Sequence, residues 1–187
     1  MPPSTPSRAV IRDGVEADVP RCVALDHSYD AEYVYQIQVN TDEESGWSIV
    51  LRKERLPRPV EMGGMADPSR LKLAVPDAEC FLVAQQRETG DILGYLAMQH
   101  DRRHRLGLIH DLVVDRPERR QQIGTRLYGA ARIWAKEQHI TRINVEVQSK
   151  NLHGVLFFEG LGFNFCGYND RHFPNQDVAL FLSTSLR

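Results

Sequence analysis

The strongest constraint on the fold is a strand, a basic turn and a long amphipathic helix that follow one another in the second half of the chain. Residues 106–114 (LGLIHDLVV) predict a strand, and Pro117 ends it because proline cannot donate to a strand ladder. Residues 141–148 (TRINVEVQ) alternate as a further strand. Residues 124–138 predict a helix with apolar side chains at i, i+3, i+4 and i+7: Leu127, Ala130, Ala131 and Trp134. This succession favours a sheet with helices packed on its faces.

The remaining segments extend this pattern to a mixed α/β chain. LPRP at 56–59 is expected to break the strand before it, and ETGD at 88–91 to form a hairpin turn. Residues 30–38 are aromatic-rich and ambiguous. We expect one domain over residues 8–187 after a frayed lead-in at 1–7. Further strands are predicted at 8–12, 47–55, 80–86, 92–99, 163–168 and 177–184, and further helices at 16–28, 67–74 and 151–160.

Composition excludes several classes of protein. Apolar residues make up 42% and charged residues 26% of the 187 residues, which is ordinary globular usage. No stretch approaches the roughly 20 apolar residues of a membrane span, and the N-terminus has no signal-peptide core. The cysteines are odd in number and none pair at CxxC spacing, so we expect reduced thiols in a cytoplasmic protein. No set of His, Cys and Asp has metal-ligand spacing, so no metal is expected.

Charge is distributed unevenly along the chain. The net charge is −2, which argues against general nucleic-acid binding. Residues 1–100 carry 10 basic and 16 acidic side chains, whereas residues 101–150 carry 11 basic and 6 acidic side chains. The basic centre suits a small polyanion and the acidic first half suits a cationic partner, unless both are ordinary solvated charge.

A candidate anion site lies where the basic turn meets the helix. The free N–H groups and the dipole of a helix N-terminus favour negative charge. Gly124 permits close approach of a ligand to the backbone, and Arg119 and Arg120 add charge-assisted hydrogen bonds. Neither GxxxxGK[ST] nor GxGxxG is present, so an exposed basic turn without a ligand is the alternative.

This segment resembles the coenzyme A loop of the GNAT N-acetyltransferase superfamily, R/Q-x-x-G-x-G/A. Arg119-x-x-Gln122-x-Gly124 matches at the arginine and the second glycine and departs at Gln122. VEVQ at 145–148, Asn151 and FFEGLGF at 157–163 are also similar to the family. A likeness to streptothricin acetyltransferases includes IHDLVV at 109–114 and VALF at 178–181. The resemblance implies an α/β GNAT fold, a mostly antiparallel sheet of about seven strands flanked by helices, with acetyl-CoA as cofactor.

The resemblance implies that the cofactor is held largely by backbone groups. Asn151 would contact the cofactor or cap a helix, and Phe158 would also contact the cofactor. Phe158 stands where the family has a general-acid tyrosine. Three explanations are open. The thiolate leaves unaided, or water or a hydroxyl such as that of Tyr168 replaces the acid, or turnover is slow. The pantetheine arm would pair with the strand at Leu112, Val113 and Val114. The pyrophosphate would lie on the loop of Arg119, Arg120, Gln121, Gln122, Ile123, Gly124 and Thr125.

A general base is required because an amine acceptor, with a pKa of about 10, is protonated before it attacks the thioester. Glu146, Asp111 and His110 are the candidates, and each also fits a structural role. Glu146 is polar among apolar neighbours and faces the other side of its strand. Asp111 and His110 are adjacent and so are expected to point to opposite faces. Asp111 is preferred because the resemblance keeps an acid there.

An acceptor site is expected near the first helix, where acidic and aromatic residues suit an ammonium group by charge and cation–π contact. These residues are Asp26, Asp30, Glu32, Tyr33 and Tyr35; a solvated acidic loop over aromatic core residues is the alternative. We expect direct acetyl transfer to a small-molecule amine, with no nucleic-acid or membrane partner, by a monomer or homodimer. A coenzyme A-binding sensor with little catalysis, or a protein or peptide N-acetyltransferase, are the alternative functions.

Overall fold

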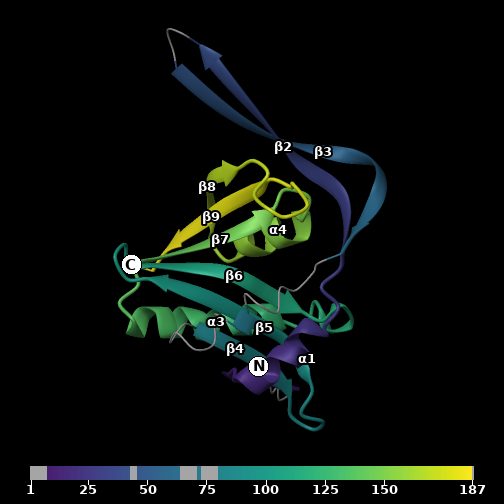
Figure 1. The fold of residues 1–187 in the computed structure, drawn as a ribbon, viewed down its shortest axis with the longest axis vertical. Coiled ribbons are helices and arrows are strands. Elements are labelled where there is room, and N and C mark those ends of the chain that lie inside the picture. Colours follow the sequence, from purple (N-terminus) through teal and green to yellow (C-terminus); the bar gives the residue numbers. More distant parts are fainter. Residues whose placement is uncertain (1–7, 43–45, 64–70, 73–79, 187) are drawn as a thin grey trace, which may run out of the picture. The chain divides into compact units, whose positions relative to one another are not determined.

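The computed structural model describes residues 8–42, 46–63, 71–72 and 80–186 (Figure 1). Its helices are α1 (Val19–Val23), α3 (Ile123–Glu137) and α4 (Leu152–Gly160), with 3-10 turns η1 (Glu16–Asp18) and η2 (Arg116–Glu118). Its strands are β1 (Ala9–Asp13), β2 (Tyr29–Asp42), β3 (Gly46–Met62), β4 (Cys80–Gln86), β5 (Ile92–Asp101), β6 (Leu106–Val114), β7 (Arg142–Gln148), β8 (Asn164–Asn169) and β9 (Ala179–Ser185).

Seven of the described strands form one sheet in the order β1-β4-β5-β6-β7-β9-β8, and β2 and β3 form a separate two-stranded sheet. The β1, β4, β5 and β6 strands pair antiparallel, and β6 and β7 pair parallel. Helix α3 joins the parallel pair, because parallel neighbours require a crossover connection. The predicted mixed α/β class, with a mostly antiparallel sheet of seven strands flanked by helices, is confirmed.

The described residues divide into two compact units. The first lies within 8–28, 63–145 and 183–186, and the second within 29–62 and 146–182. The first unit holds β1, β4, β5, β6, α1 and α3, whereas the second holds β2, β3, β8 and α4. The expectation of one domain over residues 8–187 remains a prediction.

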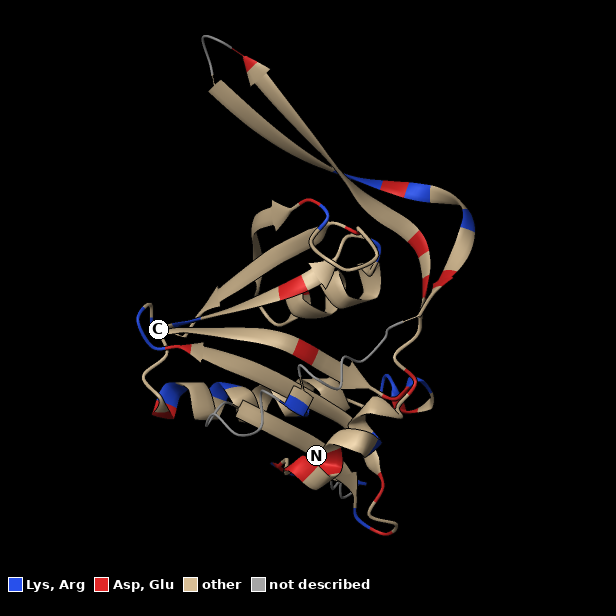
Figure 2. Ribbon diagram, viewed as in Figure 1, with Lys and Arg blue, Asp and Glu red and all other residues tan. Residues whose placement is uncertain are grey.

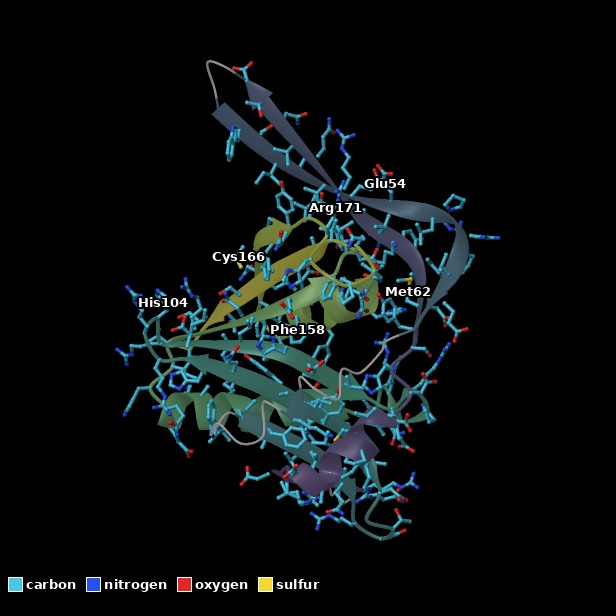
Figure 3. The ribbon with its side chains drawn as sticks, in the orientation of Figure 1. Glu54, Met62, His104, Phe158, Cys166 and Arg171 are labelled. Carbon is cyan, nitrogen blue, oxygen red and sulfur yellow. The ribbon has the colours of Figure 1, made fainter. Side chains whose placement is uncertain are left out.

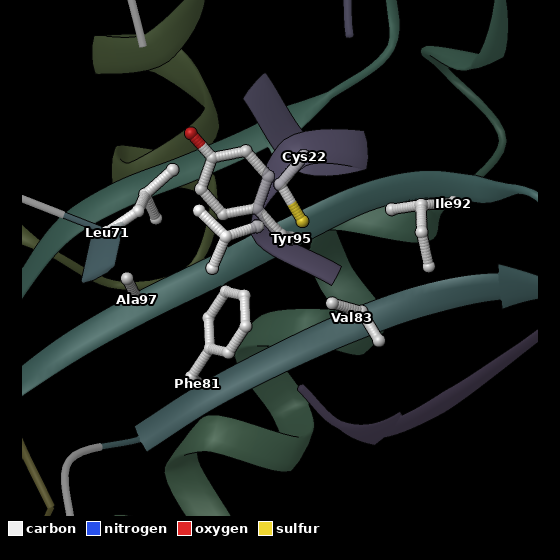
Figure 4. Close-up of a cluster of buried hydrophobic side chains, with 8 residues drawn as sticks. Cys22, Leu71, Phe81, Val83, Ile92, Tyr95 and Ala97 are labelled. Carbon is white, nitrogen blue, oxygen red and sulfur yellow. The ribbon is translucent and has the colours of Figure 1, made fainter. Parts of the chain in front are cut away.

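One face of the first unit's sheet is covered by α1. Tyr95, from β5, is fully buried at its centre and meets the Phe81 ring edge-on at 6.4 Å (Figure 4). Burying such a cluster removes several hundred square ångströms of apolar surface from water, at roughly 25 cal/mol per Å². The cluster consists of Val19, Cys22, Leu71, Phe81, Val83, Ile92, Tyr95 and Ala97.

Helix α3 packs on β4, β5 and β6 of the same unit. Its most buried side chains recur every four residues, at Ile123, Leu127, Ala131 and Ala135. Ala130 and Trp134, which the sequence also placed on this face, are only half-buried. The small residues at 131 and 135 let the helix approach the sheet closely.

Three predicted elements differ in the structure. The first helix is shorter than 16–28, since it consists of η1 and the five-residue α1. Residues 30–38 belong to β2, and β3 continues through LPRP to Met62. The register passes from Tyr33↔Arg55 to Ala31↔Val60, so LPRP is looped out of the ladder and its prolines need not donate. The predicted helix at 67–74 and the lead-in at 1–7 lie outside the described residues, except that 71–72 are helical.

Candidate functional site

A β-bulge in β6 changes the direction of the candidate bases. In the ladder with β5, Asp111 pairs with Ala97 and the next pair skips His110. Paired residues share a face, so Asp111 lies on the face of Ala97. His110 Nε2 lies 3.0 Å from Gln99 Oε1, and Gln99 shares that face because it is two residues from Ala97. The prediction of opposite faces is therefore wrong, because the bulge interrupts the alternation.

The second half of β6 has a ladder on only one side in the described structure. Pairing with β7 ends at Ile109 and Val145, whereas pairing with β5 continues to Val114. One edge of residues 112–114 therefore carries no described strand, and an extended ligand could pair there as an added strand does.

The turn between β6 and α3 has a left-handed backbone at two residues. Arg120 and Gln122 have φ angles of 65° and 61°, a region that costs residues other than glycine about 1–2 kcal/mol. Gln122 is the N-cap of α3, and no described side chain caps this helix end. The first intrahelical bond is Arg126 N–H to the Gln122 carbonyl at 3.0 Å, so the N–H groups of residues 123–125 point out of the end. This backbone therefore presents open N–H groups in an arrangement that suits an anion.

The Arg119 guanidinium binds the protein itself. Its Nε donates to the Val114 carbonyl at 2.9 Å, and its terminal nitrogens donate to the carbonyls of Ser28 at 2.7 Å and Asp26 at 2.9 Å. Arg116 Nη1 also donates to Ser28 Oγ at 2.9 Å. These bonds connect the turn to the segment after α1. Arg119 therefore stabilises the backbone of the candidate anion site and does not point its guanidinium at a ligand.

Basic residues outnumber acidic ones on this turn, and Figure 2 shows both kinds there. Four arginines lie on it or on the first turn of α3, against two acidic residues, Asp115 and Glu118. The Arg120 side chain is exposed to solvent. The field near the helix N-terminus is therefore positive, which attracts a polyanion. The arginines are Arg116, Arg119, Arg120 and Arg126.

The second unit contains a cavity of about 460 Å³. Two tyrosines and two carboxylates belong to its wall: Tyr35 from β2, Tyr168 from β8, Asp170 and Asp177. Of the five residues predicted to bind the acceptor, only Tyr35 lines this cavity. The other lining residues are Val34, Gln36, Ile37, Val39, Ser149, Lys150, Gln176 and Val178.

The two carboxylates of the cavity differ in their surroundings. Asp177 is 9% exposed, binds Lys150 Nζ at 2.6 Å and accepts from Asn175 Nδ2 at 2.9 Å. Asp170 is exposed and lies 3.7 Å from Arg171 Nε. Asp177 is therefore a buried wall residue paired with Lys150, whereas Asp170 is a solvent-exposed carboxylate in a longer ion pair with Arg171.

Glu146 is held by a histidine that the sequence analysis did not single out. His172 Nε2 lies 2.9 Å from Glu146 Oε2, and the Glu146 side chain is only 8% exposed. His172 Nδ1 lies 3.1 Å from Asn169 Nδ2, which can only donate. A carboxylate oxygen can only accept, so His172 donates from Nε2 to Glu146. The partners lie 26 residues apart, and no motif spacing would have linked them.

Two residues to which the family resemblance gave a role lie in α4 or at its N-cap. Asn151 is its N-cap, because its side chain accepts from Gly154 N–H at 2.8 Å. Phe158 is 5% exposed and packs edge-on against Phe157 and Phe163, each at 5.2 Å between ring centroids (Figure 3). Phe158 is therefore a packing residue without a proton to donate.

The other residues predicted to bind the acceptor lie elsewhere in the two units. Asp26 belongs to the first unit, where its carboxylate accepts from Ser28 N–H and Oγ–H, and these bonds lower its pKa. Asp30 and Glu32 are exposed on β2. The Tyr33 ring lies beneath Lys53 Nζ, which is 4.6 Å from its centroid.

Three further expectations concern thiols, metals and membranes. Cys22 and Cys80 are buried, and Cys166 is exposed; all three are free thiols. Burial raises the pKa of Cys22 and of Cys80 to about 12. Among the residues that the structure describes, no cluster of His, Cys, Asp and Glu could hold a metal ion. None of the described helices has the length and apolar character needed to cross a membrane.

The seven-stranded sheet, with open N–H groups at the start of the helix that joins its parallel strands, matches the fold of acyltransferases. Residues 38–163 match the acetyltransferase (GNAT) family, so the chain belongs to that family, whose acyl donor is acetyl-CoA. The expected family, enzyme class and cofactor are confirmed. A search of curated proteins finds no match.

Solved structures share this fold at low sequence identity. A nourseothricin acetyltransferase is 21% identical, with a TM-score of 0.79, over 96% of this chain and 99% of that one. A putative streptothricin acetyltransferase from Bacillus anthracis str. Ames, in complex with acetyl coenzyme A, is 20% identical, with a TM-score of 0.74, over 95% and 98% of the two chains. The ribosomal-protein-S18-alanine N-acetyltransferase from Escherichia coli is 12% identical, with a TM-score of 0.68, over 95% and 94%.

Proposed function

We propose that this acetyltransferase moves the acetyl group of acetyl-CoA directly to a primary amine of a small cationic molecule. The observation that carries the proposal is the cavity of the second unit. Its rings, Tyr35 and Tyr168, attract an ammonium ion by cation–π contact, and its exposed carboxylate, Asp170, attracts one by charge in competition with Arg171, which lies 3.7 Å away. Similarity to a nourseothricin and a streptothricin acetyltransferase supports a small-molecule acceptor.

The residues of the turn before α3 fit the donor. The left-handed Arg120 and Gln122 and the open N–H groups of residues 123–125 suit its pyrophosphate, and the β6 edge at 112–114 suits its extended pantetheine arm. When bound, acetyl-CoA supplies an acyl thioester, whose carbonyl carbon the amine attacks and whose thiolate leaves. Backbone N–H groups of the β6 edge are the proposed stabilisers of the oxyanion.

Glu146 is the proposed general base. Its carboxylate is shielded from solvent and oriented by His172, as a positioned base requires. The cavity wall begins at Ser149, three residues further along, and three residues of extended chain span about 10 Å. A proton would therefore reach Glu146 through water. Asp111 and His110, in the first unit, remain the alternative bases.

The thiolate is proposed to leave without a protein acid at position 158. A thiol is a far better leaving group than an alcohol because its pKa is about 8.5. Tyr168 is the hydroxyl of the cavity wall that could replace the missing acid. Replacement of Tyr168 by Phe separates the two routes, since a required acid would lower kcat and a wall residue would change mainly KM.

The test is acetyl transfer to a panel of amines that differ in charge, followed by thiol release. We expect turnover with amines that carry a second positive charge. Asp170→Asn should raise KM for those amines about two- to fivefold, because an exposed charge pair contributes roughly 0.5–1 kcal/mol, with little change for singly charged amines. Glu54→Gln, an exposed β3 residue outside the cavity, is the matched control. Equal effects of the two variants would contradict the acceptor site.

A second candidate function is a coenzyme A-binding sensor with little catalysis, and buried Phe158 favours it. Calorimetric titration with acetyl-CoA distinguishes it from the enzyme, because binding without turnover on any amine supports the sensor. Activity on peptides alone would instead support a protein or peptide N-acetyltransferase.

A further inference from the structure

The segment at the end of β8 and in the loop before β9 contributes to two features of the second unit. Tyr168, on β8, and Asp170 and Asp177, in the loop, belong to the cavity wall. His172 lies in the same loop and bonds to Glu146 on β7. One short segment therefore carries residues of the proposed acceptor site and the partner of the proposed base.

The backbone of this loop has an unusual conformation between the two features. Arg171, which is labelled in Figure 3, has a φ of 52°, in the left-handed region that residues other than glycine rarely adopt. Its neighbours on either side meet different partners, since Asp170 belongs to the cavity wall and His172 contacts Glu146. Such conformations persist where the surrounding contacts maintain them, and they are typical of functional sites.

Hydrogen bonds hold the loop in place. The Phe173 N–H donates to the Asp177 carbonyl at 3.3 Å, and the Gln176 N–H donates to the Phe173 carbonyl at 2.8 Å. The Asp177 carboxylate is bonded to Lys150 Nζ at 2.6 Å. The loop therefore presents His172 from a fixed frame.

The His172 ring is confined by its neighbours. The ring of Phe173 lies nearly perpendicular to it, at 5.1 Å between centroids, and the ring of Phe181 on β9 does so at 5.6 Å. Asn169 Nδ2 lies 3.1 Å from the other ring nitrogen, Nδ1. A ring bounded in this way has few orientations, so its Nε2 stays directed at Glu146.

The bond matters because of where the Glu146 side chain lies. Only 8% of this side chain is exposed. Burial favours the protonated carboxyl, which cannot accept another proton, whereas a hydrogen bond to the carboxylate favours the charged form. The N–H bond to Oε2 therefore opposes the effect of burial, and it also fixes the direction of the carboxylate.

We propose that His172 is a positioning residue for acetyl transfer, which keeps the Glu146 carboxylate charged and oriented to receive the proton of the amine. This role rests on the proposed assignment of Glu146 as the general base. The amine proton passes through water to a Glu146 oxygen, while the bond from His172 Nε2 to Oε2 is kept. His172 itself forms no bond to the acceptor.

The first test compares kcat and KM for an amine that the wild type acetylates. His172→Phe keeps a ring between Phe173 and Phe181 but removes the donor, so kcat should fall about tenfold and KM should change less than about twofold. His172→Gln should recover most of kcat because its amide nitrogen reaches the position of Nε2, whereas His172→Asn is one bond shorter and should not. His153→Phe, the same change at an exposed histidine of α4, is the matched control.

KM separates positioning from a merely structural role. Tyr168 and Asp170 belong to the same segment as His172, so a variant that only disturbed this segment would raise KM for the amine. A raised KM with unchanged kcat in His172→Phe would overturn the proposal. Failure of His172→Gln to recover kcat, although circular dichroism shows it folded, would also overturn it.

The second test is a double-mutant cycle, which shows whether His172 acts through Glu146. Glu146→Gln should lower kcat about a hundredfold or more, and adding His172→Phe should cause no further loss. Losses that multiply would overturn the positioning role and leave Glu146 as the base, as would an impaired Glu146→Gln beside an unimpaired His172→Phe. An unchanged kcat in Glu146→Gln would overturn the assignment of the base and, with it, the role of His172.

Discussion

At Gln122, the backbone conformation of one residue in the turn before α3 lowers the stability of the folded protein. Its φ of 61° strains any side chain, and the family loop has glycine at this position. We expect Gln122→Gly to raise the free energy of unfolding by roughly 0.5–1 kcal/mol, because relief of about 1–2 kcal/mol outweighs the greater chain entropy of glycine. Urea unfolding measures this, and calorimetry should show acetyl-CoA affinity unchanged or higher. The control, Gln121→Gly, has no positive φ to relieve and should be destabilising.

Asp18 couples stability to pH at one residue. Both its oxygens bind the Arg12 guanidinium, at 2.7 and 2.8 Å, and these bonds lower the pKa of the carboxyl group. Because the unfolded state takes up the proton first, this stabilisation is present above about pH 4 and is lost as pH falls through the lowered pKa. We expect Asp18→Asn to cost about 2 kcal/mol at pH 7 and progressively less below pH 4. A difference independent of pH in urea unfolding would contradict the pairing.

The sequence predicted the structural role of individual residues where a single local rule determines that role. The cap at Asn151 follows from the helix beside it. The face on which the His110 side chain lies could not be predicted in this way. It depends on a β-bulge, and a bulge is defined only by the pairing with the partner strand. The contact of His172 with Glu146 was not predicted, because a side-chain pair 26 residues apart in the sequence leaves no periodic signal.

At the scale of elements, a side-chain cap anchors α4. Asn151 accepts from Gly154 N–H, and a Cβ on Gly154 would lie 2.9 Å from Asn151 Nδ2. We expect Asn151→Ala to lower the free energy of unfolding by about 1 kcal/mol and Asn151→Ser to restore most of it. Measuring acetyl-CoA affinity in both variants separates the roles of this residue. If Asn151→Ser recovers stability but not affinity, the amide contacts the cofactor; recovery of both leaves only the cap.

The elements themselves were predictable where their pattern was strong. Short apolar runs between turn residues located β4 to β6, alternation located β7, and helical periodicity located α3 to within one residue at each end. The pattern was ambiguous at β2, whose aromatic-rich sequence lacks a strict apolar alternation, and it ended the predicted strand at 47–55 too early because LPRP reads as a strand end. Only the register shows that the prolines are looped out.

At the scale of the whole molecule, the reactivity of the three thiols reports which parts of the chain are buried. Cys22 is 0% and Cys80 2% exposed, in α1 and β4 of the first unit, and both have a raised pKa. Cys166 lies on β8 and is exposed (Figure 3). Thiolate is the reactive form, so a buried thiol with a high pKa reacts only when its surroundings open.

We therefore expect one fast-reacting thiol in the native protein and three in urea, measured with a disulfide reagent. Cys166→Ser should remove the fast phase alone, because the other two thiols are buried and react only when the first unit's core opens. Their rate then measures opening of the first unit's core, and it should rise in Asp18→Asn, which loosens the connection between β1 and the start of α1. A second fast thiol in Cys166→Ser would contradict the packing of that core. The same variant removes background from thiol-release assays, so it is the appropriate parent for testing acetyl transfer.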